Sequence, residues 1–373
     1  MLKQSEVEQV LAGTLGKVIN SSAIENGFFA LVETEEGIKL VAVTKGDCPL
    51  EKYWQAEKCV EQDGFKITLL VKNANNVALV RRYLKWTAPT ACGARGVSVG
   101  VMEVGDVDRG IILPEFKNRQ IKPVLADATA ADLAKAGRNF LNLTDEATWS
   151  VFAADWRNGY GANAAGLTTE EEIVKALLYG YSMIGFDASD KIVVENTKLD
   201  DAAIQKKFED FPMEFQAAVN ASYLNVEFQV GKHKISFTPE EVRRIVLEYG
   251  EVIMHVQFIY NSYLKSTPWP IDFELVLRPN GRPLSAKEHY LIANELERNG
   301  VKITTFLFDA LDKLSDEELQ LHAEIANTFE YRLSIAHAEV AQNDWKAFLK
   351  VAKDKAHFKV STVVAVKAFL QKI

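Results

Sequence analysis

The order of apolar and polar residues predicts a small mixed domain in the first part of the chain. Residues 27–32, 38–43 and 65–71 read as strands, with residues 33–37 as the hairpin turn between the first two. Residues 73–84 place their apolar side chains at helical spacing. We therefore predict an α+β domain over residues 1–90.

Strand and helix patterns alternate through the rest of the chain. Strand candidates cover residues 98–104, 121–126, 160–163, 182–187, 272–277, 302–308, 332–337 and 357–361. Helical candidates cover residues 170–179, 200–208, 239–262, 286–299, 315–329 and 343–350. Such alternation favours a parallel sheet, and eight repeats are what a (β/α)8 TIM barrel needs. The prediction is an α/β protein with this barrel over residues 91–373.

Two features qualify the barrel prediction. The stretch between the fourth and fifth strands is long and mostly helical, which predicts a helical insertion around residues 198–268. A doubly wound open sheet is the alternative architecture. It is disfavoured because no glycine-rich phosphate turn follows the first strand.

The stretch 147–169 has the form of one barrel unit. Its first half is an amphipathic helix that ends at Gly159, a helix-stopping residue. A short run of small residues follows, and then Thr168 or Thr169 caps a second helix with acidic residues in its first turn. In a barrel the residue at the carboxyl end of a strand faces the site, and here that residue is Asn163.

The predicted carboxyl ends of the other strands supply the candidate chemistry. Asp187, Asp309, His337 and Glu339 are residue types that form a carboxylate and imidazole metal site. The alternative is that His337 is a hydrogen-bonded loop residue. No His-x-His, HExxH or paired-cysteine motif appears. The remaining candidates at strand ends are Glu103, Asp106, Asp127, Arg278, Lys359 and Ser361.

Two cationic side chains at the predicted strand ends favour an anionic ligand in the pocket between them. Arg278 and Lys359 follow the fifth and eighth strands and lie on the same face of a barrel. Arginine suits a carboxylate because it binds both oxygens. The alternative is that Arg278 only pairs with a nearby acid such as Asp272 or Glu274. His289 starts the helix after the fifth strand, where it either caps that helix or reaches the pocket.

Composition narrows the function classes. The chain has 373 residues, of which 48% are apolar, and a formal net charge of -8, which disfavours nucleic-acid binding. No apolar run reaches membrane-spanning length, and the first residues lack the apolar core of a signal peptide. Three unpatterned cysteines fit a reducing cytoplasm, so a cytoplasmic protein is expected. The oligomeric state cannot be read from the sequence.

Short motifs in a fixed order resemble the tagaturonate/fructuronate epimerase family. They are residues 147–152 with Trp156-Arg157 and 159–169, 86–89, 98–100, 122–126, 136–138, 186–189, 288–296, 322–326 and 333–335. The likeness runs from about residue 80 to residue 360. It implies a cytoplasmic barrel enzyme that uses a divalent metal to epimerise a keto-uronic acid.

The chain departs from the family pattern at the functional positions. After the third strand, where the family carries two acidic residues and a metal-binding histidine, this chain has Asn163, Ala165 and Gly166. The catalytic glutamate segment after the fifth strand is replaced by Arg278-Pro279-Asn280, and Ala336 stands where the family has a histidine, with His337 one residue later. The family's last histidine is kept as His357, but the run beginning at Lys359 is changed.

These departures leave two hypotheses. In the first, the chain is an epimerase-like barrel that has lost the metal and catalytic residues and keeps a sugar-acid pocket containing Asn163, Arg278 and His289. In the second, it is an active isomerase, epimerase or lyase with a relocated site. Its candidate catalytic residues are Asp187, Asp309 and Lys359, and the remaining metal-ligand candidates are His337 and His357. Bound divalent metal or a reactive lysine is expected only under the second hypothesis.

Overall fold

The computed structural model describes residues 2–279, 281–309, 311 and 314–373. The chain begins with a five-stranded antiparallel sheet in the order β1-β2-β3-β5-β4. Val7, Val10 and Leu11 of helix α1 pack on one face of this sheet. The elements of this part are α1 (Gln4–Thr14), β1 (Lys17–Ile24), β2 (Gly27–Thr34), β3 (Gly37–Thr44), β4 (Ala56–Gln62), β5 (Phe65–Leu70) and α2 (Ala74–Tyr83).

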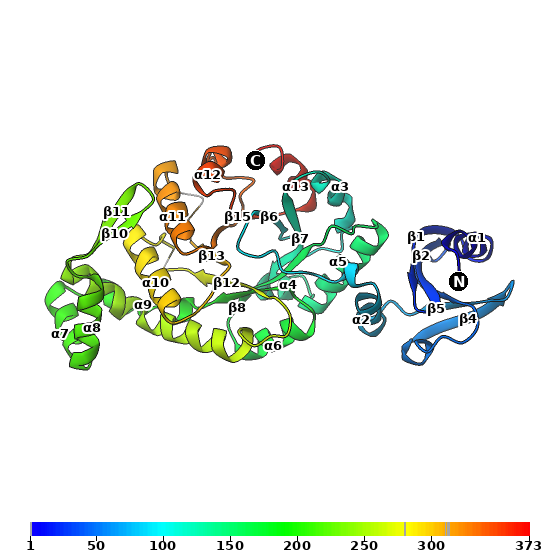
Figure 1. Ribbon diagram of the computed structural model, residues 1–373, viewed down its shortest axis with the longest axis horizontal. Helices are drawn as coiled ribbons and strands as arrows, with labels where there is room; N and C mark the ends of the chain where they lie inside the picture. The colour runs from blue at the N-terminus through cyan, green and yellow to red at the C-terminus, as the bar shows by residue number, and fades with distance from the viewer. Residues whose placement is uncertain (1, 280, 310, 312–313) are drawn as a thin grey trace.

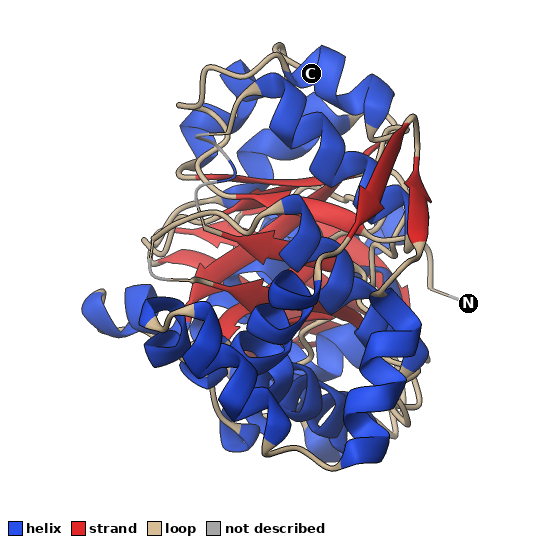
Figure 2. Ribbon diagram, turned by 90° about the vertical axis from the view of Figure 1, so that its left-hand side faces the viewer, coloured by secondary structure: helices blue, strands red, loops and turns tan. Residues whose placement is uncertain are grey.

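Eight parallel strands then close into a barrel, in the order β12-β13-β14-β15-β6-β7-β8-β9. Figure 2 shows the strands at the centre of this part, with helices around them. The strands are β6 (Val97–Val101), β7 (Ile121–Thr129), β8 (Gly161–Leu167), β9 (Met183–Asp187), β12 (Asp272–Leu277), β13 (Thr305–Phe308), β14 (Arg332–Ile335) and β15 (Ala356–Val360). The predicted barrel is confirmed, and the open-sheet alternative is wrong.

The helices around the barrel bury one apolar side each, and all of those described below except the short Leu113–Phe116 begin at polar caps. For example, the Thr169 and Ser285 side chains accept hydrogen bonds from the backbone N–H three residues later, which satisfies otherwise unpaired donors. The outer helices are α3 (Leu113–Phe116), α4 (Ala130–Lys135), α5 (Phe140–Ala153), α6 (Glu170–Leu178), α10 (Ala286–Arg298), α11 (Asp316–Thr328), α12 (Trp345–Val351) and α13 (Val363–Phe369).

The segment between β9 and β12 projects from one end of the molecule, and the N-terminal sheet lies at the opposite end (Figure 1). It contains α7 (Asp201–Glu209), α8 (Met213–Tyr223), the hairpin β10 (Glu227–Val230) and β11 (His233–Ser236), and α9 (Pro239–Ile259), which runs back to the barrel. None of the described helices is long and apolar enough to cross a membrane. The domain limits expected at residue 90 and around residues 198–268 stay predictions.

The N-terminal sheet and the barrel share an apolar cluster. Phe29 and Leu31 of β2 and Val80 of α2 pack in the same cluster as Phe152 of the barrel helix α5. Arg81 of α2 adds an ion pair to Asp145 of α5, with 2.9 Å between Nη2 and Oδ1. The two parts are therefore packed against each other and are not joined by a linker alone.

Several strand limits and elements differ from the sequence predictions. Strand β7 continues to Thr129 and β8 to Leu167, so Asp127 and Asn163 lie inside their strands and not at the carboxyl ends. The predictions also missed α1, β1, β4, α8 and the β10–β11 hairpin. Strand β4 is exposed along most of its length, so it lacks the apolar alternation by which a strand is recognised.

Candidate functional site

A cavity of about 300 Å³ opens at the carboxyl ends of the barrel strands. Asp127, Glu274 and Lys359 lie at its floor, and Arg278 and His337 at its rim. The other lining residues are Met102, Thr129, Asp132, Ala165, Gly166, Val276, Leu307, Phe308, Asp309, Leu311 and Ala336. Barrel proteins bind ligands at this end, and ligand pockets span about 300–1,000 Å³, so this cavity is the candidate site.

A buried ammonium group lies between two buried carboxylates below this cavity. The Lys359 Nζ is 2.7 Å from Oε2 of Glu274 and 3.1 Å from Oδ1 of Asp127. The Asn163 amide donates to both carboxylates, over 3.0 Å to Asp127 and 2.9 Å to Glu274. Among the described residues Glu274 Oε1 has no hydrogen-bond partner, although it is buried. An unpaired buried acceptor is costly, so a ligand hydroxyl or a water molecule is expected to bind it.

Two glycines make room for this charged interior. A Cβ atom on Gly100 would lie 1.9 Å from Oδ2 of Asp127, and one on Gly185 would lie 2.8 Å from Oε2 of Glu274. Both glycines occupy strands, β6 and β9, whose neighbours supply the carboxylates. Branched apolar side chains fill most barrels, whereas here missing side chains leave space for polar ones.

The charges of the buried network stabilise one another. Burial raises the pKa of Asp127, but the nearby Lys359 and His357 outweigh it, so the pKa ends below its ordinary value. Burial lowers the pKa of Lys359, but Asp127 and Glu274 outweigh it and raise the pKa above its ordinary value. Lys359 is therefore held as an ammonium ion. A protonated amine acts as a fixed cation or a proton donor, not as a nucleophile.

His357 uses both of its ring nitrogens within the network. Its Nε2 is 2.8 Å from Oδ2 of Asp127, and its Nδ1 is 2.8 Å from Oγ of Ser98. Ser98 also accepts a 2.8 Å hydrogen bond from the buried Arg332. With both nitrogens engaged, His357 has no lone pair directed at the cavity.

Arg278 lies at the rim between two acidic residues. It forms an ion pair with Asp187, and its Nε is 3.6 Å from Oδ1 of Asp309. Its backbone N–H also donates to the Ser189 hydroxyl over 2.8 Å. Arg278 therefore pairs with nearby acids, as the alternative expected, but these are Asp187 and Asp309 and not Asp272 or Glu274. Arg278 keeps 40% of its side chain exposed, which leaves donors open to a ligand.

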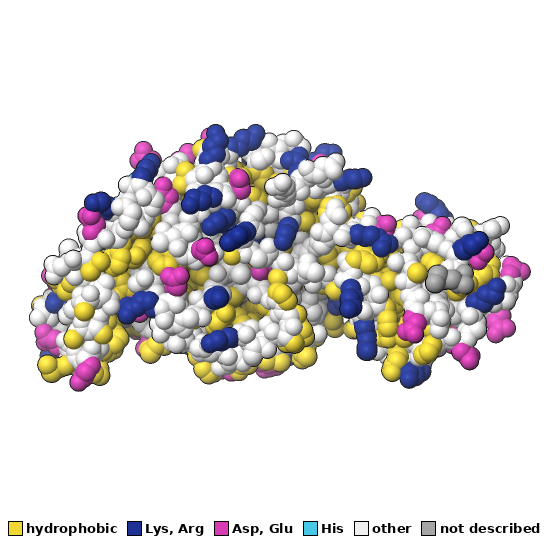
Figure 3. Space-filling model, in the orientation of Figure 1, with side chains coloured by type: hydrophobic (Ala, Val, Ile, Leu, Met, Phe, Trp, Pro, Cys, Tyr) yellow, Lys and Arg dark blue, Asp and Glu magenta, His cyan; other side chains and the backbone are white. Residues whose placement is uncertain are grey.

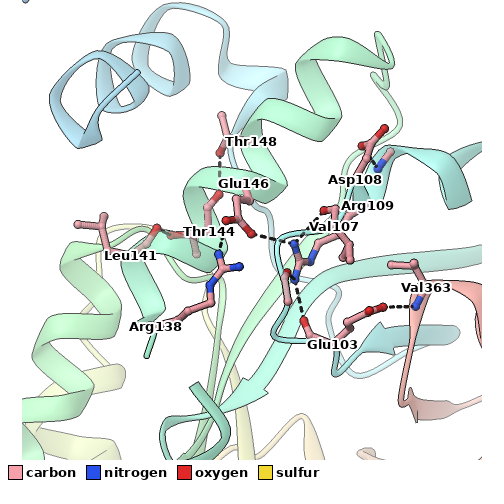
Figure 4. A network of polar contacts seen from close by, with 12 residues as sticks. Glu103, Val107, Asp108, Arg109, Arg138, Leu141, Thr144, Glu146, Thr148 and Val363 are labelled. Carbon is pink, nitrogen blue, oxygen red and sulfur yellow. Dashed lines mark hydrogen bonds and ion pairs between the residues drawn. The ribbon is translucent and has the colours of Figure 1, made fainter. Parts of the chain in front are cut away.

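The loop after β6 forms another part of the rim, and a buried arginine holds it (Figure 4). Arg109 donates to the carbonyl groups of Glu103 over 2.6 Å and of Val107 over 3.3 Å. Glu146 of α5 pairs with Arg109 at 3.0 Å and also with Arg138. The Glu103 carboxylate accepts from the backbone N–H of Val363 over 2.8 Å, which ties this loop to the start of α13.

His289 does not reach the cavity. It is fully buried behind β13, where its ring packs against Phe306 and Phe308. Its Nε2 is 2.5 Å from the Tyr331 hydroxyl, and its Nδ1 is 2.8 Å from Nδ1 of His322. The sequence placed this histidine correctly at the start of a helix, but it could not show which side of the helix faces the strands.

His337 stands at the rim in a left-handed conformation, with a φ of 52°. Its Nδ1 is 3.1 Å from the Ser361 hydroxyl. Of the site residues predicted from the sequence, the structure therefore brings Arg278, Asp309, His337 and Lys359 to one cavity, with Asp187 bound to Arg278. Asn163 and His357 lie in the network below.

The donor set does not fit the divalent metal that the family resemblance implies. No group of three or more His, Cys, Asp or Glu side chains in the described part of the chain could hold a metal ion. Ala165, Gly166 and Ala336 line the cavity without donor side chains. The Lys359 ammonium occupies the space between the two interior carboxylates, where it would repel a cation.

Sequence reasoning missed part of the site. Glu274 was considered only as a partner for Arg278, and Ser98 only as part of a strand and of a family motif. The signal that could have found Glu274 was its position: it is a charged residue inside an otherwise apolar strand, Asp272–Leu277. A charge at a buried strand position is paired or functional.

Fold and site together define a (β/α)8-barrel protein with a polar cavity at the carboxyl ends of its strands, a class that binds small molecules there. A model of the tagaturonate epimerase family matches residues 19–369. The chain belongs to this family.

Individual relatives agree with this assignment. The tagaturonate/fructuronate epimerase of Thermotoga maritima is 27% identical over 352 residues, which are 90% of this chain and 70% of that protein. The glycerol-bound crystal structure of the fructuronate-tagaturonate epimerase UxaE from Cohnella laeviribosi has a TM-score of 0.84 and 27% identity, covering 96% of this chain and 74% of that one. Its native crystal structure has a TM-score of 0.81.

Proposed function

We propose that this chain binds a keto-uronic acid at the mouth of its barrel without the metal-dependent chemistry that the resemblance implies. The observation that carries the proposal is the lining of the cavity. Ala165, Gly166 and Ala336 stand at positions that the resemblance assigns to acidic and imidazole ligands. Epimerisation beside a carbonyl needs a base, an acid and a stabiliser for the developing oxyanion. Those three side chains supply none of them.

The positions of the charged side chains in the cavity indicate how the proposed ligand is oriented. Its carboxylate faces Arg278 at the rim, whose guanidinium can bind both oxygens. Its hydroxyl and keto oxygens face the floor, where Lys359 donates and Glu274 Oε1 accepts. The lining as a whole does not attract anions, because four carboxylates (Asp127, Asp132, Glu274 and Asp309) face two cations. The preference for an acid therefore rests on the local position of Arg278.

A binding titration tests this function. We expect D-tagaturonate to bind more tightly than its neutral parent sugar, D-tagatose, and Arg278→Ala to remove most of the difference. Losing a hydrogen bond to a charged group costs about 1.5–3 kcal/mol, or about tenfold or more in affinity. Arg298→Ala is the matched control, because Arg298 is also half exposed and paired with a carboxylate, but far from the mouth. Equal affinity for acid and sugar contradicts the proposal.

Metal analysis tests the second part of the proposal, that the chain lacks the metal-dependent chemistry of the family. The purified protein is expected to contain less than one equivalent of divalent metal per chain, because the cavity lacks a convergent donor set. One tightly bound zinc, nickel or manganese ion per chain, lost in His337→Ala, would show that the family's metal chemistry has been rebuilt from other residues.

A second candidate function is an active isomerase with a relocated site. It is favoured by one observation, that Arg278, Asp309, His337 and Lys359 line the same cavity. Under this function Lys359 donates a proton and His337 accepts one. Conversion of tagaturonate to fructuronate in the presence of a chelator, abolished in a folded His337→Ala variant, would establish it. If no conversion is observed, the active isomerase is ruled out and the binding function stands.

A further inference from the structure

A second pocket lies at the opposite end of the barrel. It has a volume of about 590 Å³ and is lined by Cys92, Gly93, Ala94, Arg95, Lys122, Glu330 and Lys355. Its charged residues stand at the amino ends of four strands: Arg95 precedes β6, Lys122 begins β7, Glu330 precedes β14 and Lys355 precedes β15. These strands are consecutive in the ring, in the order β14-β15-β6-β7. The closed topology therefore gathers one charged side chain from each strand.

Cations outnumber carboxylates in the lining of this pocket, where Glu330 is the one acidic residue. Within the described ranges, neither Arg95, Lys122 nor Lys355 forms an ion pair with a carboxylate. Lys122 donates to the Cys92 carbonyl over 3.0 Å, which holds its ammonium group at the pocket. Burial lowers the pKa of Lys355, and the nearby cations Lys353 and Arg95 lower it further, although Glu330 opposes them. A concentration of unpaired positive charge is unexpected in a chain of net charge -8.

Two backbone N–H groups of the pocket are already hydrogen-bonded within the protein. The N–H groups of Cys92 and Gly93 donate to the Asp272 carboxylate, over 2.6 Å and 2.9 Å. This bond fixes the loop that carries Arg95 against the start of β12. Recognition of a ligand therefore falls to the three cationic side chains.

We propose that this pocket binds a phosphate-type dianion through Arg95, Lys122 and Lys355. Three cations and the one carboxylate of Glu330 leave two uncompensated positive charges, which a phosphate dianion neutralises and a monocarboxylate does not. Arginine supplies a planar pair of donors and lysine a compact charge, and both suit phosphate oxygens. The ligand is either the free ion or a phosphate monoester, since the two share this chemistry.

The site is distinct from the mouth, so it can be tested separately. Calorimetric titration of the full chain with sodium phosphate, at neutral pH and constant ionic strength set by sodium chloride, should show saturable binding at one site. The double variant Arg95→Gln/Lys355→Gln should bind at least about tenfold more weakly, because each lost charge-assisted bond costs about 1.5–3 kcal/mol. Both side chains reach solvent, so the variant should fold; its thermal unfolding provides the check.

Controls separate the pocket from general charge effects. Arg298→Gln/Lys346→Gln removes two exposed cations elsewhere and should leave phosphate affinity unchanged. Arg278→Ala at the mouth should also leave it unchanged. Glycerol 3-phosphate binding at least as tightly as phosphate identifies a monoester as the ligand, and weaker binding identifies the free ion. No saturable binding, equal weakening in both double variants, or loss in Arg278→Ala overturns the proposal.

Discussion

Gly100 shows how much the barrel interior depends on one absent side chain. We expect Gly100→Ala to destabilise the protein by about 3 kcal/mol or more, because its Cβ would overlap the Asp127 carboxylate. Urea unfolding measures the change. The matched control is Gly250→Ala in α9, where a Cβ atom meets nothing within 4 Å. That substitution should stabilise the helix by about 0.5–1 kcal/mol. Equal effects of the two would contradict this account of the interior.

Lys359 neutralises two carboxylates that cannot reach water. We expect Lys359→Met to destabilise the fold by about 3–5 kcal/mol at neutral pH, the usual cost of leaving a buried charge unpaired. The exposed Lys367, also paired with a glutamate, is the control, and Lys367→Met should change stability by less than about 1 kcal/mol. A loss at Lys359 no larger than at Lys367 would show that the carboxylates are not charged.

The pH dependence follows from the two shifted pKa values. Because the pKa of Asp127 is lowered in the folded state, its contribution exists above the ordinary carboxyl range and disappears as pH falls through the lowered value. Because the pKa of Lys359 is raised, its contribution exists below the ordinary lysine value and disappears as pH rises through the raised one. The contribution of this pair, taken as the difference in free energy of unfolding between the wild type and Lys359→Met at each pH, should show a plateau between these limits.

Individual site residues were placed correctly where they follow a strand, as Arg278 and His337 do. Asp127 and Asn163 were found but placed at the rim, because their strands were read several residues short. Lys359 was also placed after its strand, but it lies inside β15. Contacts such as Lys359 to Glu274 join positions 85 apart in the chain and depend on the stagger of the closed barrel. No local pattern in the sequence encodes that stagger.

At the scale of elements, two histidines join helices α10 and α11. One ring nitrogen of His322 donates a hydrogen bond to the backbone carbonyl of Leu284, so the other, Nδ1, accepts from Nδ1 of His289. Nε2 of His289 in turn accepts from the Tyr331 hydroxyl. Burial lowers the pKa of His322 to about 4 and holds that of His289 well below its ordinary value. Both rings are therefore neutral in the folded protein.

This arrangement predicts a loss of stability in mild acid. The unfolded chain binds protons at these histidines below about pH 6.5, whereas the folded chain does not, so stability falls as pH decreases from that value towards 4. A shift of this size in His322 corresponds to about 3 kcal/mol. His322→Gln should reduce the pH dependence in this window, measured by urea unfolding. An unchanged slope would mean that His322 is charged when folded.

Strands and helices were predicted better than their limits. All eight barrel strands were located, because each is a short apolar run between helical patterns. Strand β1 was missed since its sequence, KVINSSAI, mixes polar residues into the buried positions, and Ser21 and Ser22 are buried there. Their burial depends on packing of the sheet against other elements, which sequence alternation does not record.

At the scale of the whole molecule, Phe152 connects the two parts. This α5 side chain is fully buried against the N-terminal sheet and α2, and its ring centroid lies 5.9 Å from that of Trp86 in an edge-on contact. We expect Phe152→Ala to cost about 3–5 kcal/mol and to increase protease cleavage between residues 85 and 96. Phe258→Ala, at a half-exposed phenylalanine of α9, should do neither. Unchanged cleavage in Phe152→Ala would show that the two parts hold together without this contact.

The closed barrel also decides where another chain could add a strand. Each of its eight strands pairs on both sides, so the ring offers no template for intermolecular β-pairing. Among the described strands, those with an unpaired side are β1 and β4 of the five-stranded sheet and the β10–β11 hairpin. Charged residues such as Lys17 on β1 and Glu57, Lys58 and Glu61 on β4 are exposed at these edges. Resistance to fibrillar aggregation in this protein therefore depends on the two small sheets, although the barrel contains most of the residues.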